Sequence, residues 1–213
     1  MDRLHTRSFN IGNVKIGGQN KVLIQSMCNI KTSKYQEVIK QILTLEKYGC
    51  DIIRVSIMDE QDAEAIKYIK KEIHIPLVGD IHFDYRLALL AMDNGIDKIR
   101  INPGNIGSKE NVDKIILKAK EKNVAIRIGV NSGSLDEETL KKHDNKVTAE
   151  GIVSLAEKYI KYFEEQGFYN LVISLKSSSV LQTIEAYRLA SKKLNYPLHL
   201  GITEAGNKDV GLI

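Results

Sequence analysis

Three arginines occupy similar places in three short aliphatic segments: Arg54, Arg100 and Arg127. Each has a branched aliphatic residue on both sides: Ile53 and Val55, Ile99 and Ile101, Ile126 and Ile128. Because neighbouring side chains of a β-strand point to opposite faces, aliphatic neighbours that pack outward would turn all three guanidinium groups inward. A fourth cation, Lys176, follows another aliphatic segment by two residues.

The planar guanidinium group matches the oxygens of phosphate. Four cations in one low-dielectric space would repel one another without counter-charge. We therefore favour a ligand with two phosphates or a diphosphate. In the alternative, the arginines pair with internal carboxylates, for which Asp80 and Glu204 are available. Two carboxylates against four cations would still leave a positive surplus.

Other polar residues follow the same aliphatic segments. Asp80 and His82 are two residues apart, and His82 could donate to a phosphate, act as an acid or be merely structural. Asn102 and Asn131 lie just beyond two of the arginines and offer amide hydrogen bonds. Glu204 is a candidate for proton transfer or for orienting an arginine.

Strand and helix patterns alternate along the chain, which predicts βαβ units with parallel strands. We expect strands at residues 22–26, 52–56, 77–80, 98–101, 125–129, 171–174 and 198–202, preceded by a hairpin at residues 8–11 and 15–16. No Gly-x-Gly-x-x-Gly turn follows the first strand, which weakens an open dinucleotide-binding sheet. Polar residues that close strand after strand favour a TIM (β/α)8-type barrel with its site at the carboxyl ends of the strands. We expect one domain over residues 1–213, truncated after strand seven.

Composition excludes several other classes of protein. The chain has 213 residues, 43% hydrophobic and 27% charged, as in ordinary globular domains. Its net charge of +4 is spread over predicted helix faces, so we expect no nucleic-acid partner. No stretch approaches the ~20 apolar residues of a membrane span, and the first residues lack a signal-peptide apolar region. We expect a cytoplasmic protein without a membrane partner.

The chain resembles a known family at six motifs: Gln25-Ser-Met27, Asp51 to Ser56, Asp80 to Arg86, Lys98 to Gly107, Ile126 to Ser134 and His199 to Gly206. In this order they resemble the 4-hydroxy-3-methylbut-2-enyl diphosphate synthases, iron–sulfur oxidoreductases of the non-mevalonate isoprenoid pathway. The resemblance implies a TIM barrel that holds 2-C-methyl-D-erythritol 2,4-cyclodiphosphate. It implies reductive opening of the ring, loss of a hydroxyl as water, two electrons from ferredoxin or flavodoxin, and a homodimer.

The resemblance also implies residue roles. Seven positions would grip the diphosphate: Arg54, Arg100, Arg127, Lys176, His82, Asn102 and Asn131. Asp80 would support them, and Glu204 would lie near the reacting carbon. The family's 4Fe-4S cluster is held by three cysteines and a glutamate of a C-terminal domain. Because Cys28 and Cys50 do not match these ligands, we expect no metal ligand in this chain and no activity from it alone.

Two other interpretations remain open at this point. One is a diphosphate-binding barrel module without redox activity. The other is a pterin-binding barrel of the dihydropteroate synthase type, against which the three arginines and the segment from Asp80 to His82 argue.

Overall fold

The computed structural model describes residues 6–131, 133, 135, 137–177 and 179–201. Its main sheet consists of six parallel strands: β3 (Gln25–Met27), β4 (Ile52–Ser56), β5 (Leu77–Asp80), β6 (Lys98–Ile101), β7 (Ala125–Asn131) and β8 (Leu171–Lys176). The strands pair in chain order, without the reversal that defines a doubly wound sheet. The fold is therefore a curled half-barrel, which confirms the barrel prediction.

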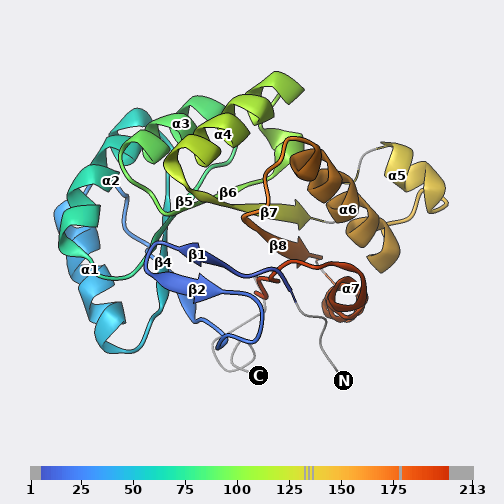
Figure 1. Cartoon of the computed structure of the whole chain (residues 1–213), viewed down its shortest axis with the longest axis horizontal. Helices are drawn as coiled ribbons and strands as arrows, with labels where there is room; N and C mark the ends of the chain where they lie inside the picture. Colours follow the sequence, from blue (N-terminus) through green and yellow to red (C-terminus); the bar gives the residue numbers. More distant parts are fainter. Residues whose placement is uncertain (1–5, 132, 134, 136, 178, 202–213) are drawn as a thin grey trace.

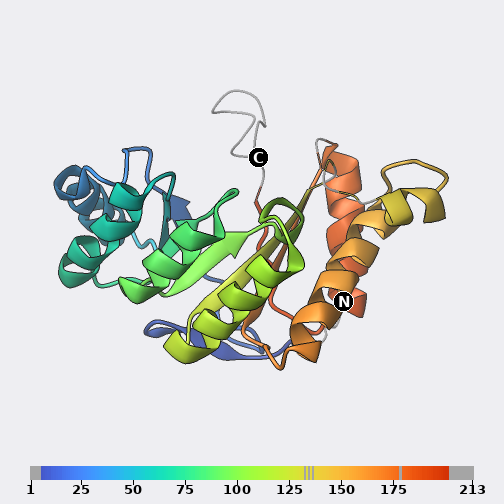
Figure 2. The ribbon, with the colours of Figure 1, turned by 90° about the horizontal axis from the view of Figure 1, so that it is seen from above.

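Helices cover the outer side of the curled sheet, as Figures 1 and 2 show. The longer ones are α1 (Tyr35–Lys47), α2 (Glu60–Glu72), α3 (Tyr85–Asp93), α4 (Lys109–Lys122), α6 (Ala149–Glu165) and α7 (Val180–Lys193). A short 3-10 helix, η1 (Pro103–Asn105), follows β6, and a short α5 (Glu137–Lys142) lies within the connection after β7. No described helix has the length and apolarity that crossing a membrane requires.

The alternation of side chains along the strands divides apolar from polar residues. The aliphatic neighbours of the three arginines are buried in one large core together with residues of the covering helices. Asp80, Lys98, Asn102, Arg127 and Ser174 are the buried polar residues at or near the strands. The sheet thus packs an apolar outer face against helices and turns a polar face inward.

A hairpin of β1 (Phe9–Ile11) and β2 (Val14–Ile16) confirms the predicted N-terminal element. Gly12 takes a φ of +54° in its turn, a conformation that glycine adopts without strain. Ile11 packs in a second apolar cluster with Ile52, Val78, Ala125 and Val172 from the sheet. The hairpin therefore closes one end of the half-barrel (Figure 2).

Strand ends differ from the expected ones in three places. The first strand begins at Gln25, which pairs with Ile52, rather than at residue 22, because the amide of Ile24 bonds to the Asp51 carboxylate instead of a strand partner. Strands β7 and β8 run on as a pair to Asn131 and Lys176. At the expected seventh strand, Leu198 makes an isolated parallel bridge to Ile173, and residue 202 lies outside the described residues.

Candidate anion-binding site

Strand register brings the predicted cationic residues together on the inner face. Arg100 pairs directly with Arg127 on the neighbouring strand, and Asp80 pairs with Arg100 on the other side. Adjacent strands lie about 4.8 Å apart, so the two guanidinium groups start from neighbouring backbone positions. Lys176 pairs with Asn131 further along β7 and β8.

Asp80 is the carboxylate around which this cluster is arranged. Its Oδ1 lies 3.3 Å from Nη1 of Arg100, and its Oδ2 lies 3.8 Å from Nε of Arg54. The same Oδ2 is 3.7 Å from Nε2 of His82. Asp80 thus forms ion pairs with two of the three arginines, Arg54 and Arg100. In the part of the chain that the structure describes, no carboxylate forms an ion pair with Arg127 or Lys176.

Arg127 is the most deeply buried of the arginines, with 1% of its surface exposed. Its Nη2 donates to the Ser174 hydroxyl at 3.0 Å, but its Nε and Nη1 have no partner among the described residues. Burial, followed by the charges of Arg54 and Arg100, lowers the pKa of Arg127 to about 9, so it remains a cation at neutral pH. Buried unpaired donors are costly, and an anionic ligand would satisfy them.

Two further buried donors have no partner among the described residues. They are Nε of Arg100 and Nδ2 of Asn102. The Asn102 side chain is already fixed, because its Oδ1 accepts from the Gly104 amide at 3.1 Å at the start of η1. Its amide nitrogen is therefore held ready to donate without a further side-chain rearrangement.

Gly129 allows Arg100 to lie against β7. A Cβ at this position would stand 3.0 Å from Nε and 3.1 Å from Nη2 of Arg100. A side chain at this position would require the guanidinium group to shift by a few tenths of an ångström.

The rim of the site contains more exposed groups. Lys176 is partly buried, and burial followed by the charges of Arg127, Arg54 and Arg100 lowers its pKa. The side chain of His82 is 40% exposed. Glu204 lies outside the described residues.

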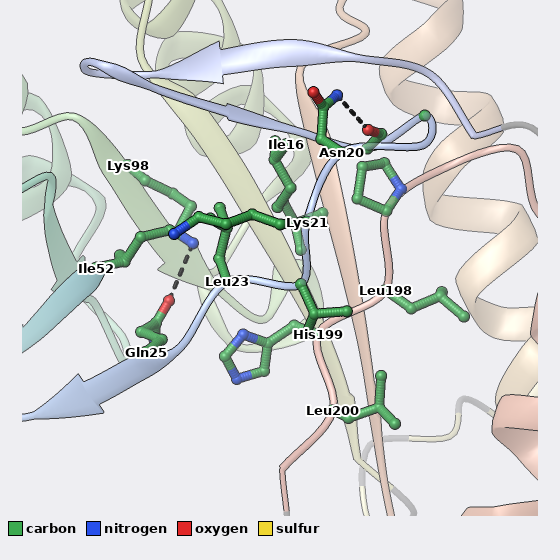
Figure 3. A pocket seen from close by; sticks show the side chains of 15 residues that line it. Ile16, Asn20, Lys21, Leu23, Gln25, Ile52, Lys98, Leu198, His199 and Leu200 are labelled. Carbon is green, nitrogen blue, oxygen red and sulfur yellow. Dashed lines mark hydrogen bonds between the residues drawn. The ribbon is translucent and has the colours of Figure 1, made fainter. Parts of the chain in front are cut away.

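Sequence reasoning assigned no role to two residues near this cluster, Lys98 and His199. Lys98 lies two residues before Arg100 on the same strand face, is 1% exposed and donates to Oε1 of Gln25 at 3.1 Å (Figure 3). Burial, then the charges of Arg127 and Arg54, lowers its pKa to about 7. Lys98 and His199 both line a cavity of about 200 Å³. Burial and nearby cations lower the pKa of His199. The alternation that identified Arg100 also applied to Lys98.

The described residues do not fit an iron–sulfur cluster. Within them, no group of three or more His, Cys, Asp or Glu side chains is placed to hold a metal. Cys28 and Cys50 are both buried free thiols. Burial, then the proximity of Cys50, raises the pKa of Cys28 to about 12, which disfavours the thiolate that binds iron.

Comparison with known proteins identifies the family. The model of the GcpE TIM-barrel domain matches residues 6–213. The chain belongs to this family. It is 57% identical over 208 residues to "4-hydroxy-3-methylbut-2-en-1-yl diphosphate synthase (flavodoxin)" of Caldanaerobacter subterraneus subsp. tengcongensis, covering 98% of this chain and 58% of the relative. The protein of the same name from Clostridium perfringens is 53% identical over 213 residues, covering 100% of this chain and 61% of the relative.

The chain therefore spans about 60% of the length of these curated relatives. Among solved structures, Plasmodium falciparum HPPK-DHPS with pterin and p-hydroxybenzoate matches with a TM-score of 0.71 and 15% identity, over 93% of this chain and 38% of that one. This likeness shows a shared barrel fold and nothing about the ligand. The names of the curated relatives favour the diphosphate synthase over the pterin-binding alternative.

Proposed function

We propose that this chain is the substrate-binding barrel of a 4-hydroxy-3-methylbut-2-en-1-yl diphosphate synthase, an oxidoreductase of isoprenoid biosynthesis. Its ligand would be the cyclic diphosphate 2-C-methyl-D-erythritol 2,4-cyclodiphosphate. The observation that carries the proposal is the in-register pair Arg100 and Arg127, which together present three buried guanidinium nitrogens without partners among the described residues. The printed names of the relatives supply the reaction class.

The site is suited to binding and orienting a dianionic group. Arg127 and Lys176 would supply the charge that no described carboxylate balances. Asp80 would hold Arg54 and Arg100 in place and, through its Oδ2, restrict His82. His82, Asn102 and Asn131 would donate hydrogen bonds, with His82 also a candidate acid. We place Glu204 near the reacting carbon on the family resemblance alone.

Reduction of the ring requires two electrons that the described residues have no means to carry. We propose that a 4Fe-4S cluster outside the described residues supplies them. Flavodoxin, the partner in the relatives' names, is the proposed donor, with ferredoxin as the alternative. We further propose a homodimer and a cytoplasmic location.

Calorimetric titration with the cyclic diphosphate tests the site. Arg127→Ala should weaken binding by about 1.5–3 kcal/mol, the scale of a hydrogen bond to a charged group. Arg127→Lys should restore only part of this loss, because an ammonium lacks the planar fork. The matched control is Arg188→Ala, which removes an exposed arginine of α7 and should leave affinity unchanged. An affinity of Arg127→Ala equal to that of the natural protein would remove the basis of the proposal.

A further inference from the structure

The thioether of Met27 lies against one edge of the Arg54 guanidinium group. Nε of Arg54 is 3.0 Å from Sδ of Met27 and Nη2 is 2.8 Å from it, so two donors of the arginine point at a single sulfur. Strand register produces this contact, because Met27 is the Cα partner of Arg54 between β3 and β4. The contact therefore forms on the inner face of the sheet, where the proposed anion site lies.

This sulfur is the only hydrogen-bond partner of the Arg54 guanidinium group among the described residues. The Asp80 carboxylate is 3.8 Å from Nε, beyond hydrogen-bond distance, so it attracts the charge without fixing the plane of the group. Burial lowers the pKa of Arg54, the charge of Asp80 raises it and the charge of Arg100 lowers it again. Attraction and repulsion thus both act on this arginine, and the sulfur supplies the directional contact.

The acceptor is neutral, as are the partners of two other cations on this face. Lys98 donates to the side-chain amide of Gln25, and Arg127 donates to the hydroxyl of Ser174. A thioether is a weak acceptor without charge. It can therefore orient a guanidinium group without cancelling the positive charge that an anionic ligand needs.

The contact also decides which donors of Arg54 remain for a ligand. Nε and one N–H of Nη2 are directed at the sulfur, which leaves the second N–H of Nη2 and both of Nη1. Within the part of the chain that the structure describes, Nη1 makes no hydrogen bond. Without the sulfur the group could rotate, and binding would have to restore the productive orientation.

We propose that Met27 is a positioning residue of the anion site: its sulfur holds the guanidinium group of Arg54, with its charge uncancelled, in the orientation that receives the diphosphate. A methionine that only filled space could be replaced by any side chain of similar volume, whereas this role requires an acceptor atom. The inference rests on the proposed function, because it assumes that Arg54 binds an anion.

Two variants at the same position separate volume from acceptor chemistry. The readout is the affinity of the protein, at its natural length, for the cyclic diphosphate by calorimetry. Met27→Leu keeps the volume and removes the acceptor, so it should weaken binding by about 3- to 10-fold, the scale of one ordinary hydrogen bond. Met27→Gln supplies a neutral amide oxygen on a side chain of similar length, so it should restore most of the affinity.

Arg54→Ala tests whether Met27 acts through the arginine. Adding Met27→Leu to a protein that already carries Arg54→Ala should cause no further loss, because both changes remove the same contact. The matched control is Met92→Leu, which makes the same exchange at a methionine of α3 that is 1% exposed in the apolar core. It should leave the affinity unchanged.

The positioning role is wrong if Met27→Leu binds as tightly as the natural protein, if Met27→Gln loses as much as Met27→Leu, or if the losses add in the cycle with Arg54→Ala. An equal loss in Met92→Leu would likewise reduce the effect to core packing. If Met27→Leu does not fold, Met27→Ala takes its place in the same comparison with Met27→Gln, because Met27 is only partly buried.

Arg127→Ala separates this proposal from the proposed function. If that variant weakens binding and Met27→Leu does not, only the positioning role fails. If neither variant weakens binding, the anion site fails as well.

Discussion

Lys98 shows how strongly the inner face of this barrel concentrates positive charge. It is fully enclosed, its one hydrogen-bond partner among the described residues is the neutral amide of Gln25, and Arg54 and Arg127 lie nearby. Its pKa falls from 10.5 to about 7, first through burial and then through these charges. A lysine with a lower pKa in the folded state binds fewer protons there than in the unfolded chain, so its contribution to stability rises with pH.

We therefore predict that Lys98→Met raises the free energy of unfolding most at pH 6–7, where the natural lysine must be buried with its charge. Between about pH 7 and 10.5 the natural protein should gain on the variant by at most about 1.4 kcal/mol per pH unit, the value for one proton. Urea unfolding of both proteins at pH 6.5, 8 and 9 measures this difference. Parallel stability curves would mean that Lys98 carries the same charge in both states.

At the scale of elements, the register between β6 and β7 determines the shape of the site. Arg100 is opposite Arg127, and its guanidinium group lies against Gly129, two residues further along β7. Gly129→Ala would place a methyl group 3.0 Å from Nε of Arg100. The backbone at Gly129 is not in the left-handed region, so the substitution acts on the arginine rather than on the strand.

Gly129→Ala should accordingly weaken binding of the cyclic diphosphate by about 5- to 50-fold while the protein stays folded, the scale of one misplaced charged hydrogen bond. Calorimetry, with circular dichroism to verify folding, is the measurement. Gly133→Ala provides the control, because a Cβ there meets no atom within 4 Å. Equal affinity in the two variants would show that the position of Arg100 over β7 is unimportant.

The strands themselves were predictable where local pattern decides them. Aliphatic residues on both sides of Arg54, Arg100 and Arg127 fixed the outward face of three strands, and the structure buries those residues under helices. The ends of β7 and β8 were predicted too short, because Asn131 and Lys176 are polar residues whose strand conformation depends on pairing with each other. A local sequence pattern does not reveal that two residues so far apart in the chain will pair.

The same limit applies to the site. The arginines could be assigned to the inner face by alternation. The sequence could not show, however, whether Asp80 or Glu204 is the carboxylate that pairs with two of them. Ser174 gave no signal, since a serine in a strand is ordinary until the fold brings it to Arg127. The alternation that placed Arg100 on the inner face applies to Lys98 as well. Lys98 was missed because it is the first residue of its strand.

On the scale of the whole molecule, the half-barrel combines two ends of opposite character. The hairpin and the apolar cluster around Ile11 close one end, near which Lys98 begins β6, whereas Arg100, Asn131 and Lys176 lie toward the carboxyl ends of the strands. This division is the usual one in TIM barrels, where one face supports stability and the other supports function. In the proposed site, the unpaired donors of Arg100, Asn102 and Arg127 would serve the functional end.

A crystal structure of the protein at its natural length with bound 2-C-methyl-D-erythritol 2,4-cyclodiphosphate would test this account most directly. We predict phosphate oxygens within 2.7–3.2 Å, the ordinary hydrogen-bond range, of Nε and Nη1 of Arg127 and of Nε of Arg100. The bond from Arg127 to Ser174 should persist in the complex. A diphosphate bound elsewhere, with these donors still unpaired, would contradict the central claim that the inner arginines form its binding site.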